Sequence, residues 1–392
     1  DVRDDSNPAA SADASDTRSP VDPCRGPSTT ILRDTNVSGG RTLEDNGCYY
    51  VEGLVTVRDG TLEIEPGVEL SFLDDDDGKA GRLLISESAS LVAAGTQTNP
   101  VVIHTRSHRR GQSRGVRIEP GSQGNRIDHV VFEHHGADAT HIALDIAAPA
   151  TVTNTVFREN DGYALALRPS ANLVELGNNT IHQNQRALLV SPGHVPSLDE
   201  TTVIEQNSQN YVQITHTADT EVDSAQSWSP LGAPFLVSGT LRISAHLRVE
   251  PDTHIEFHRD AGLLVEDTGA LTLDGSESER VIMLPHDDHD GWRGIRFNTD
   301  SELNVIRHAS IGGAGSRSWT NDEESAAAVV VGEEFIQRGS VTFENANIFD
   351  SAADGVRVSE GDLSGCETIT FGDVDGEPIR LSGTSATADC AP

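Results

Sequence analysis

Arginines crowd one short stretch of a chain that is otherwise strongly acidic. Residues 106–117 read Arg-Ser-His-Arg-Arg-Gly-Gln-Ser-Arg-Gly-Val-Arg, which places five arginines within twelve residues. A guanidinium group is a planar fork of N–H donors that matches a carboxylate or a sulfate. The stretch is therefore a candidate anion site, and a loop whose arginines pair with the protein's own carboxylates is the alternative. Its candidate ligand-binding residues are Arg106, His108, Arg109, Arg110 and Arg114.

Clustered carboxylates next to glycine occur at three places, and they suit calcium, which takes oxygen ligands around a sharp turn. Residues 74–79 read Asp-Asp-Asp-Asp-Gly-Lys, residues 286–291 read His-Asp-Asp-His-Asp-Gly, and residues 373–377 read Asp-Val-Asp-Gly-Glu. The two imidazoles of the second stretch are also zinc ligands. No precise ligand motif is met, so a solvated acidic turn is the alternative at each place. The candidate metal ligands are Asp74, Asp75, Asp76, Asp77, Asp287, Asp288, Asp290, Asp373 and Asp375.

Trp292 and Arg293 follow the second acidic stretch and complete the candidate ligand-binding set. The indole ring is able to stack on a sugar, although packing explains a tryptophan at this position equally well. His129 and His308, at matching positions in the two halves of the chain, are expected to face a corner of the fold rather than a substrate. A Ser-His-Asp hydrolase is disfavoured because the chain has no Gly-x-Ser-x-Gly elbow.

The elements that must position these residues are repeats. Residues 62–72, Leu-Glu-Ile-Glu-Pro-Gly-Val-Glu-Leu-Ser-Phe, return at 247–257 as Leu-Arg-Val-Glu-Pro-Asp-Thr-His-Ile-Glu-Phe. Apolar and polar residues alternate on either side of the Glu-Pro corner, which is the period of a strand with one buried face. Residues 114–118 correspond to 293–297 and residues 127–129 to 306–308, both at an offset of 179. The sequence therefore predicts an internal duplication.

A shorter period runs inside each copy. Apolar segments ending at Phe132, Phe157, Ile181 and Ile204 follow one another at intervals of 25, 24 and 23 residues. Short strands at this spacing, with no helical period, are typical of a stacked solenoid whose turns lie about 4.8 Å apart. Asparagines stand three residues after the last three of these positions, and we expect them to form a ladder at one corner. They are Asn160, Asn184 and Asn207.

Together, the Pro-Gly-Val corner, Gly95-Thr96 before Asn99-Pro100-Val101, and the Asn-Thr-x-Ile/Phe rungs resemble secreted right-handed parallel β-helix proteins of the pectate-lyase-like superfamily. The resemblance covers roughly residues 48–385 and implies an all-β, right-handed parallel β-helix. Lyases of this superfamily remove the proton beside a uronate with an Arg or Lys and acid-bound calcium, which makes Arg109, Arg110, Arg114 and Arg117 catalytic candidates. The signatures of the polygalacturonase-like hydrolases are not matched: Val156 and Ile181, for example, stand where the Asn-Thr-Asp motif needs an aspartate.

Net charge limits the partners. The chain carries 28 basic and 62 acidic residues, for a formal charge of −34. Such a charge argues against nucleic acid or an anionic membrane as partners, favours a soluble monomer, and suits cations or acidic polymers bridged by cations. No apolar run approaches the roughly 18 residues that a membrane-spanning helix needs.

The four cysteines stand in two pairs near the ends of the structured part, each with a spacing of 24 residues. Proximity predicts the disulfides Cys24–Cys48 and Cys366–Cys390, with four reduced thiols as the alternative. Disulfides would place the mature protein outside the reducing cytosol. The polar stretch 1–23 has too little apolar surface to fold, and together with a first residue that is not Met it predicts a tether behind a secretion or lipoprotein signal.

The predicted organisation has four parts: a disordered tether (1–23), a first β-helix copy with its cap (24–212), a joint (213–234) and a second copy with its cap (235–392). The function expected first is a secreted or surface-anchored, non-catalytic protein that binds a polysaccharide or another cell-envelope glycan, in an adhesive or envelope-structural role. The alternative is a lyase that cleaves an acidic glycan by calcium-assisted β-elimination.

Overall fold

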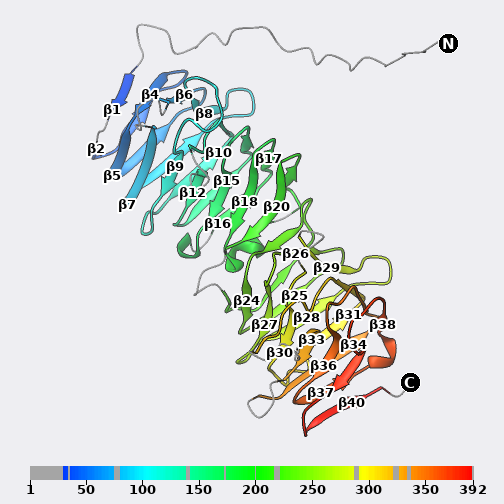
Figure 1. The fold of residues 1–392 in the computed structure, drawn as a ribbon. Coiled ribbons are helices and arrows are strands. Elements are labelled where there is room, and N and C mark those ends of the chain that lie inside the picture. The colour runs from blue at the N-terminus through cyan, green and yellow to red at the C-terminus, as the bar shows by residue number, and fades with distance from the viewer. Residues whose placement is uncertain are drawn as a thin grey trace, which may run out of the picture.

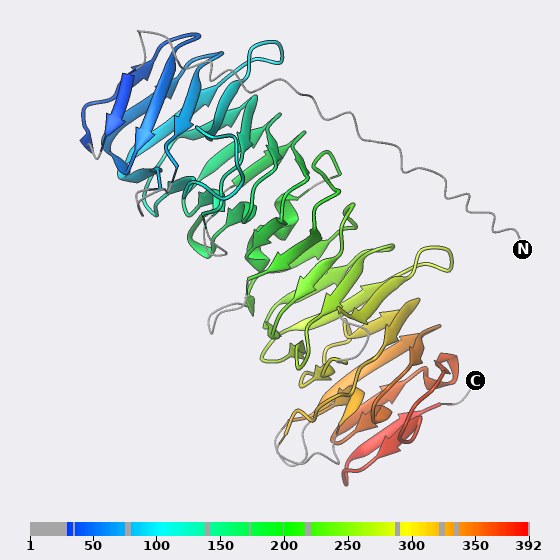
Figure 2. The same cartoon turned by 45° about the horizontal axis from the view of Figure 1, so that its top comes forward.

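The computed structural model describes residues 30–390, except 34–35, 75–79, 138–141, 172–173, 199, 216–220, 287–290, 321–325 and 333–336. The described chain has almost no helix, and its β-strands wind into an elongated parallel β-solenoid of about 13 turns (Figure 1). Two views of the molecule show the same order of colours along its length, so each turn stacks on the turn before it (Figure 2). The predicted all-β parallel β-helix is confirmed.

Helical structure among the described residues is limited to short 3-10 segments. These are η1 (Pro169–Ala171), η2 (Pro192–Ser197) and η4 (Cys366–Thr368). None of the helices in the described part of the chain has the length and hydropathy that a membrane span requires.

Three faces surround the coil in the first half, and the strands of each face pair in parallel from one turn to the next. Face one carries the strands that begin each turn. In order along the axis they are β1 (Thr30–Arg33), β4 (Cys48–Glu52), β6 (Glu69–Phe72), β8 (Val101–Thr105), β11 (Val130–Glu133), β14 (Val156–Arg158), β17 (Thr180–His182) and β19 (Val203–Glu205).

Faces two and three share the long strands β5 (Leu54–Ile64) and β7 (Arg82–Ala94), whose first parts lie on face two and last parts on face three. The other strands of face two are β2 (Asn36–Val37), β9 (Val116–Ile118), β12 (Ile142–Ile146), β15 (Tyr163–Leu167), β18 (Arg186–Val190) and β20 (Gln209–Ile214). Those of face three are β3 (Arg41–Leu43), β10 (Asn125–Asp128), β13 (Ala150–Thr153) and β16 (Val174–Gly177).

Face two runs on into the second half, because β20 pairs with β23. Its later strands are β23 (Phe235–Val237), β26 (His254–Phe257), β29 (Val281–Pro285), β32 (Ala309–Gly312), β35 (Asn347–Phe349) and β38 (Thr370–Phe371). One further sheet comprises β21 (Glu221–Val222), β24 (Thr240–Ile243), β27 (Gly262–Val265), β30 (Gly294–Phe297), β33 (Ala327–Val331), β36 (Asp354–Val358) and β39 (Ile379–Leu381). The last comprises β22 (Gln226–Trp228), β25 (His246–Val249), β28 (Ala270–Asp274), β31 (Val305–Arg307), β34 (Gly339–Glu344), β37 (Gly361–Ser364) and β40 (Ala386–Asp389).

Strands that match in sequence lie on different faces in the two halves. Phe72 ends β6 on face one, whereas its counterpart Phe257 ends β26, which continues face two. In the same way Ile85 lies on face two, and its counterpart Val265 lies in the sheet of β27. The second half is therefore turned about the coil axis by one face relative to the first.

The core is a continuous apolar column inside the coil. The inward residues of successive turns stack on one another: the rings of Phe132 and Phe157 are 5.1 Å apart and nearly parallel, and those of Phe257 and Trp292 are 3.9 Å apart. Aliphatic side chains fill most of the remaining inward positions. The core therefore consists of thin layers that each turn can supply, which agrees with the low aromatic content of the chain.

The predicted asparagine ladder is confirmed. Oδ1 of Asn184 accepts the backbone N–H of Asn160 at 3.1 Å, and Oδ1 of Asn207 accepts the backbone N–H of Asn184 at 2.9 Å. All three side chains are buried, and the backbone N–H of His135 donates to Oδ1 of Asn160 at 2.9 Å. His135 thus occupies the first rung of a corner that later turns fill with asparagine.

A disulfide closes the last turns, as predicted. Cys366 and Cys390 are bonded, with their Cα atoms 4.9 Å apart. Cys48 is also disulfide-bonded, and the described chain has no free cysteine. Cys24, its predicted partner, lies outside the described residues, as does the predicted tether.

Candidate functional site

A loop folds back over face one and buries polar side chains there. His104 in β8 and Glu133 in β11 point outward, because they alternate with the inward residues Ile103 and Phe132. Outward residues of a solenoid normally face solvent, yet His104 is 1% exposed and Glu133 is 8% exposed. The ring of His108, in the loop after β8, stacks on His104 with 4.6 Å between ring centroids. The arginine-rich loop therefore covers this part of the sheet.

Backbone and hydroxyl contacts hold this loop in place. The N–H of His108 donates to the Thr105 carbonyl at 3.1 Å, and the Thr105 hydroxyl donates to the Arg109 carbonyl at 3.1 Å. The N–H of Gly111 donates to the carbonyl of His134 at 2.9 Å, which ties the loop to the corner after β11. His108 itself has a positive φ of 51°, a conformation in which a residue other than glycine is uncommon.

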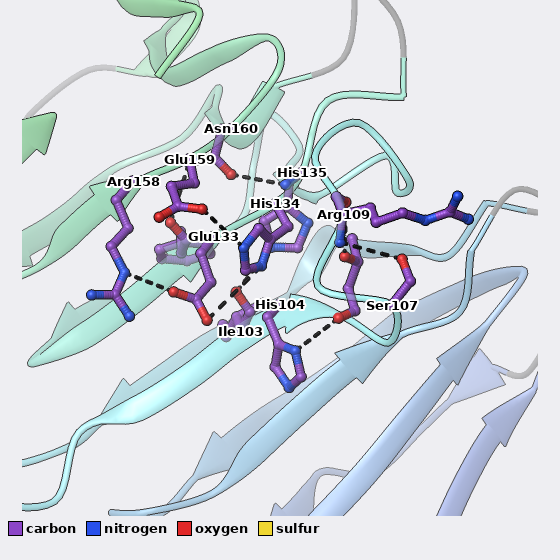
Figure 3. Close-up of polar contacts among 12 residues, drawn as sticks. Ile103, His104, Ser107, Arg109, Glu133, His134, His135, Arg158, Glu159 and Asn160 are labelled. Atoms are coloured by element: carbon purple, nitrogen blue, oxygen red, sulfur yellow. Dashed lines mark hydrogen bonds and ion pairs between the residues drawn. The ribbon is translucent and has the colours of Figure 1, made fainter. Parts of the chain in front are cut away.

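His134 stands at that corner with a positive φ of 69°. The same corner in the next three turns holds Glu159, Gln183 and Gln206 at φ values of 54–56°, so the coil dictates this backbone conformation. Nε2 of His134 lies 3.3 Å from Oε2 of Glu159, one turn further along the chain (Figure 3). Its other ring nitrogen, Nδ1, is buried, makes no hydrogen bond, and lies 3.9 Å from Oε1 of Glu133.

Burial lowers the pKa of His134 below its ordinary value, against the opposing effect of the carboxylates of Glu133 and Glu159. A neutral imidazole carries one N–H and one lone pair. With the N–H on Nε2, facing Glu159, the lone pair of Nδ1 faces the carboxylate of Glu133. This arrangement is unfavourable unless a proton or a cation lies between the two atoms.

The other carboxylate oxygen of Glu133 is already engaged: Nε of Arg158 donates to its Oε2 at 2.7 Å (Figure 3). One ligand atom each from His108, Glu133 and His134 can be chosen so that all three lie within 4.8 Å of one another. In the described part of the chain this is the one group of three or more such side chains at that separation. We refer to these three residues as the histidine site.

Two neighbouring histidines have other roles. His135 is fully buried, and burial lowers its pKa to about 3, so it is neutral; its Nε2–H donates to the carbonyl of Ile103 at 3.0 Å, and its Nδ1 accepts from the hydroxyl of Ser113. His104 donates from Nδ1 to the carbonyl of Thr105 at 2.8 Å. Its Nε2 lies 2.8 Å from Oε1 of Glu69, in an orientation that does not make a hydrogen bond.

The five arginines of the predicted anion site do not converge. Arg109 and Arg110 are exposed, and in Figure 3 the guanidinium of Arg109 points away from the histidines. Arg106 lies over the ring of Tyr50. Arg117, on face two, donates to Glu119 at 2.8 Å and to Asp145 at 2.6 Å. Burial opposes the charge of Arg117, but these hydrogen bonds raise its pKa.

Arg114 belongs with Arg117 rather than with the exposed pair. Both lie near Arg82, whose pKa is lowered by burial and by the positive charges of Arg117 and Arg114. The Nε atom of Arg114 is buried and finds no hydrogen-bond acceptor among the described residues. The predicted site therefore divides into an exposed pair, Arg109 and Arg110, and a separate basic group on face two.

The predicted metal-binding loops are only partly described. Asp74 accepts a hydrogen bond from the Ser107 hydroxyl at 2.9 Å and so helps to hold the arginine loop. Asp373 and Asp375 are exposed and are joined to Ser351 through backbone hydrogen bonds. Asp75, Asp76, Asp77, Asp287, Asp288 and Asp290 lie outside the described residues.

Trp292 is fully buried against Phe257, and its indole N–H donates to the carbonyl of Gly312 at 2.8 Å. The ring is therefore part of the core and is not open to a sugar. Arg293 lies over the ring of Trp319, 5.0 Å from its centroid. His129 and His308 both have positive φ, at the corners directly after β10 and β31.

Sequence reasoning placed His108 among anion-binding residues and did not single out Glu133 or His134. The sequence did contain a signal for this site, because six of the fifteen histidines lie between residues 104 and 141.

Comparisons with protein-family models, with curated proteins and with solved structures found no match for this chain.

Proposed function

We propose that this protein is a non-catalytic β-helix that acts outside the cytoplasm or at the cell surface and binds an acidic polysaccharide through Arg109 and Arg110. The observation that carries the proposal is the state of these two side chains: both are exposed, and neither guanidinium makes an ion pair with a described residue. In a chain of net charge −34, two neighbouring exposed arginines that pair with no carboxylate of the described residues form a local site for an anion.

The disulfide between Cys366 and Cys390 supports a location outside the reducing cytosol. The rest of the surface repels a polyanion, and salt screens that repulsion over about 10 Å at 0.1 M. We therefore expect the affinity to rise from very low to moderate salt and to fall again once the contacts of the arginines themselves are screened.

The lyase alternative has less support from the geometry. Of its candidate residues, Arg117 is neutralised by Glu119 and Asp145, and Arg114 is half-buried on a different part of the coil from Arg109 and Arg110. A lyase of this kind needs its arginine next to a carboxylate-bound calcium ion. The one metal-type group among the described residues, His108, Glu133 and His134, lies beside Arg109 and contains a single carboxylate. Asp75, Asp76 and Asp77 lie outside the described residues.

The test combines binding with an assay for cleavage. The full chain is passed over immobilised alginate, pectate and sulfated glycans, and absorbance by unsaturated uronates is followed in the same mixtures with calcium. The variant Arg109→Ala/Arg110→Ala is compared with Arg317→Ala/Arg338→Ala, which removes the same charge from two exposed arginines that pair with Asp260 and Asp362.

We expect one glycan to retain the wild type and the control variant but not the loop variant, with flat absorbance throughout. A rise in absorbance that a chelator abolishes would replace the proposal with the lyase. Equal retention of the wild type and the loop variant, or no retention by any glycan, would overturn it.

A further inference from the structure

We propose that His108, Glu133 and His134 form a binding site for a divalent transition-metal ion of the zinc type. The three side chains offer two imidazole nitrogens and one carboxylate oxygen, a donor set that zinc and its neighbours in the first transition row accept. This inference does not depend on glycan binding, because it uses none of the exposed arginines.

The distances fit an ion after small side-chain rotations. Donor atoms bound at about 2 Å in a tetrahedral zinc site lie roughly 3.3 Å apart. Nδ1 of His134 and Oε1 of Glu133 are 3.9 Å apart, and the ligand atoms of all three residues lie within 4.8 Å. An ion between them would relieve the unfavourable approach of a buried lone pair to a carboxylate oxygen.

The side chains that contact these three ligands are arranged as in known metal sites, where such neighbours fix the orientation of each ligand. A metal-bound histidine usually directs its second ring nitrogen at a carboxylate. Nε2 of His134 faces Glu159 at 3.3 Å in this way, and Arg158 holds the outer oxygen of Glu133 at 2.7 Å. His104 stacks on His108 and fixes the plane of its ring. Each ligand is therefore oriented by a neighbour that is not itself a ligand.

The second half of the chain shows that the coil does not need these residues. At the offset of 179, Glu133 and His134 correspond to Gly312, the last residue of β32, and Gly313, at the corner after it. Gly313 has a φ of 63°, close to the 69° of His134, so the two corners share one backbone conformation. The first half thus carries a buried carboxylate and a buried imidazole at two positions where the second half forms the same strand and corner with glycine.

An ion at this site would connect the loop to the sheet, because His108 comes from the loop, whereas Glu133 and His134 come from β11 and its corner. Binding should therefore rigidify the loop that carries Arg109 and Arg110. Imidazole ligands select zinc over calcium, which prefers oxygen donors only. Calcium is thus the comparison ion.

The experiment uses the untagged full chain, stripped of metal by a chelator. Zinc and calcium binding are measured by calorimetry, and the visible spectrum of added cobalt reports nitrogen coordination. The ligand variants are Glu133→Gln and His134→Gln, the latter because Gln183 and Gln206 already occupy this corner in other turns. His308→Asn is the matched control, since Asn154 and Asn345 stand at equivalent corners with the same backbone conformation.

We expect one equivalent of zinc in the wild type and in His308→Asn, and affinity reduced about 100-fold or more in each ligand variant. Glu159→Gln, which removes only an orienting carboxylate, should weaken zinc by roughly 10- to 100-fold. Zinc should also slow tryptic cleavage after Arg109 and Arg110 in the wild type and not in His134→Gln. This protection is measurable even where a variant is less stable.

Zinc affinity equal in the wild type and in folded Glu133→Gln and His134→Gln would overturn the proposal, as would an absence of zinc binding. Calcium binding as tight as zinc binding would also overturn it, because it would assign the ion to carboxylates alone.

Discussion

Oδ1 of Asn184 accepts the backbone N–H of Asn160, its equivalent one turn earlier, at 3.1 Å. The amide of Asn184 also donates to the carbonyl of Phe157 at 3.0 Å. One buried side chain therefore satisfies backbone groups of two neighbouring positions, which a corner of a parallel coil would otherwise leave without partners. The ladder is a connection along the coil axis that is independent of the strand hydrogen bonds.

Replacing Asn184 with alanine should lower the free energy of unfolding by about 3 kcal/mol, because buried donors and acceptors above and below it lose their partners. Urea denaturation measures the change. Asn347→Ala, at a half-exposed position in β35, serves as the control and should cost far less. Equal losses for the two variants would mean that the ladder adds nothing to stability.

Removing the Cys366–Cys390 disulfide by substituting both cysteines with serine should cost about 3 kcal/mol, from the entropy of the closed segment of 24 residues. In a solenoid each turn contacts only its neighbours, so the loss should be concentrated in the last turns. Hydrogen exchange should then show faster exchange in β37 and β40 and little change in β8 and β11. Uniform acceleration along the whole coil would contradict this expectation.

Acid should destabilise the protein partly through His194. Burial lowers the pKa of His194, against the hydrogen bond that its Nε2 makes with the carbonyl of Arg168. The unfolded chain then binds a proton at a higher pH than the folded chain, so stability falls as the pH drops below about 6.5. His194→Gln should lose less stability than the wild type between pH 7 and pH 5. Identical losses, measured as urea midpoints, would exclude this role.

Trp292→Phe should destabilise the protein by about 2 kcal/mol and leave glycan binding unchanged. The substitution leaves a small cavity beside Phe257 and removes the donor to the buried carbonyl of Gly312. Thermal unfolding and glycan retention are measured on the same sample. Lost retention without lost stability would show that the indole contacts the sugar.

The fold could be predicted from the sequence because each turn repeats local signals. The alternation around residues 62–72 and 247–257 indicated strands with one buried face, the spacing of Asn160, Asn184 and Asn207 indicated a corner ladder, and the equal spacing of the cysteines indicated the C-terminal disulfide. These features depend on residues within one or two turns of each other. The duplication into two copies stays a prediction.

The histidine site could not be predicted in the same way. Periodicity assigns His104 and Glu133 to solvent, since both alternate with core residues. His104 is covered by His108 of the loop after β8, which folds back over its own sheet, and Glu133 is covered in part by Arg158 of the next turn. No local pattern specifies these contacts. Nearness in sequence also does not place the arginines of residues 106–117 together, because β9 carries Arg117 onto the next face of the coil.

The second half is rotated about the coil axis by one face relative to the first half. This rotation limits how many equivalent contacts the molecule can make along one side. Side chains that correspond in sequence between the two halves point in different directions from the coil, because β6 lies on face one and β26 continues face two. About 13 turns at 4.8 Å each make the coil roughly 60 Å long. A straight polymer lying along one face would contact residues of the first half and then residues of the second half that do not correspond to them. The matched strands β6 and β26 therefore cannot present the same side chains to one straight ligand, which is what two-site binding by similar strands would require.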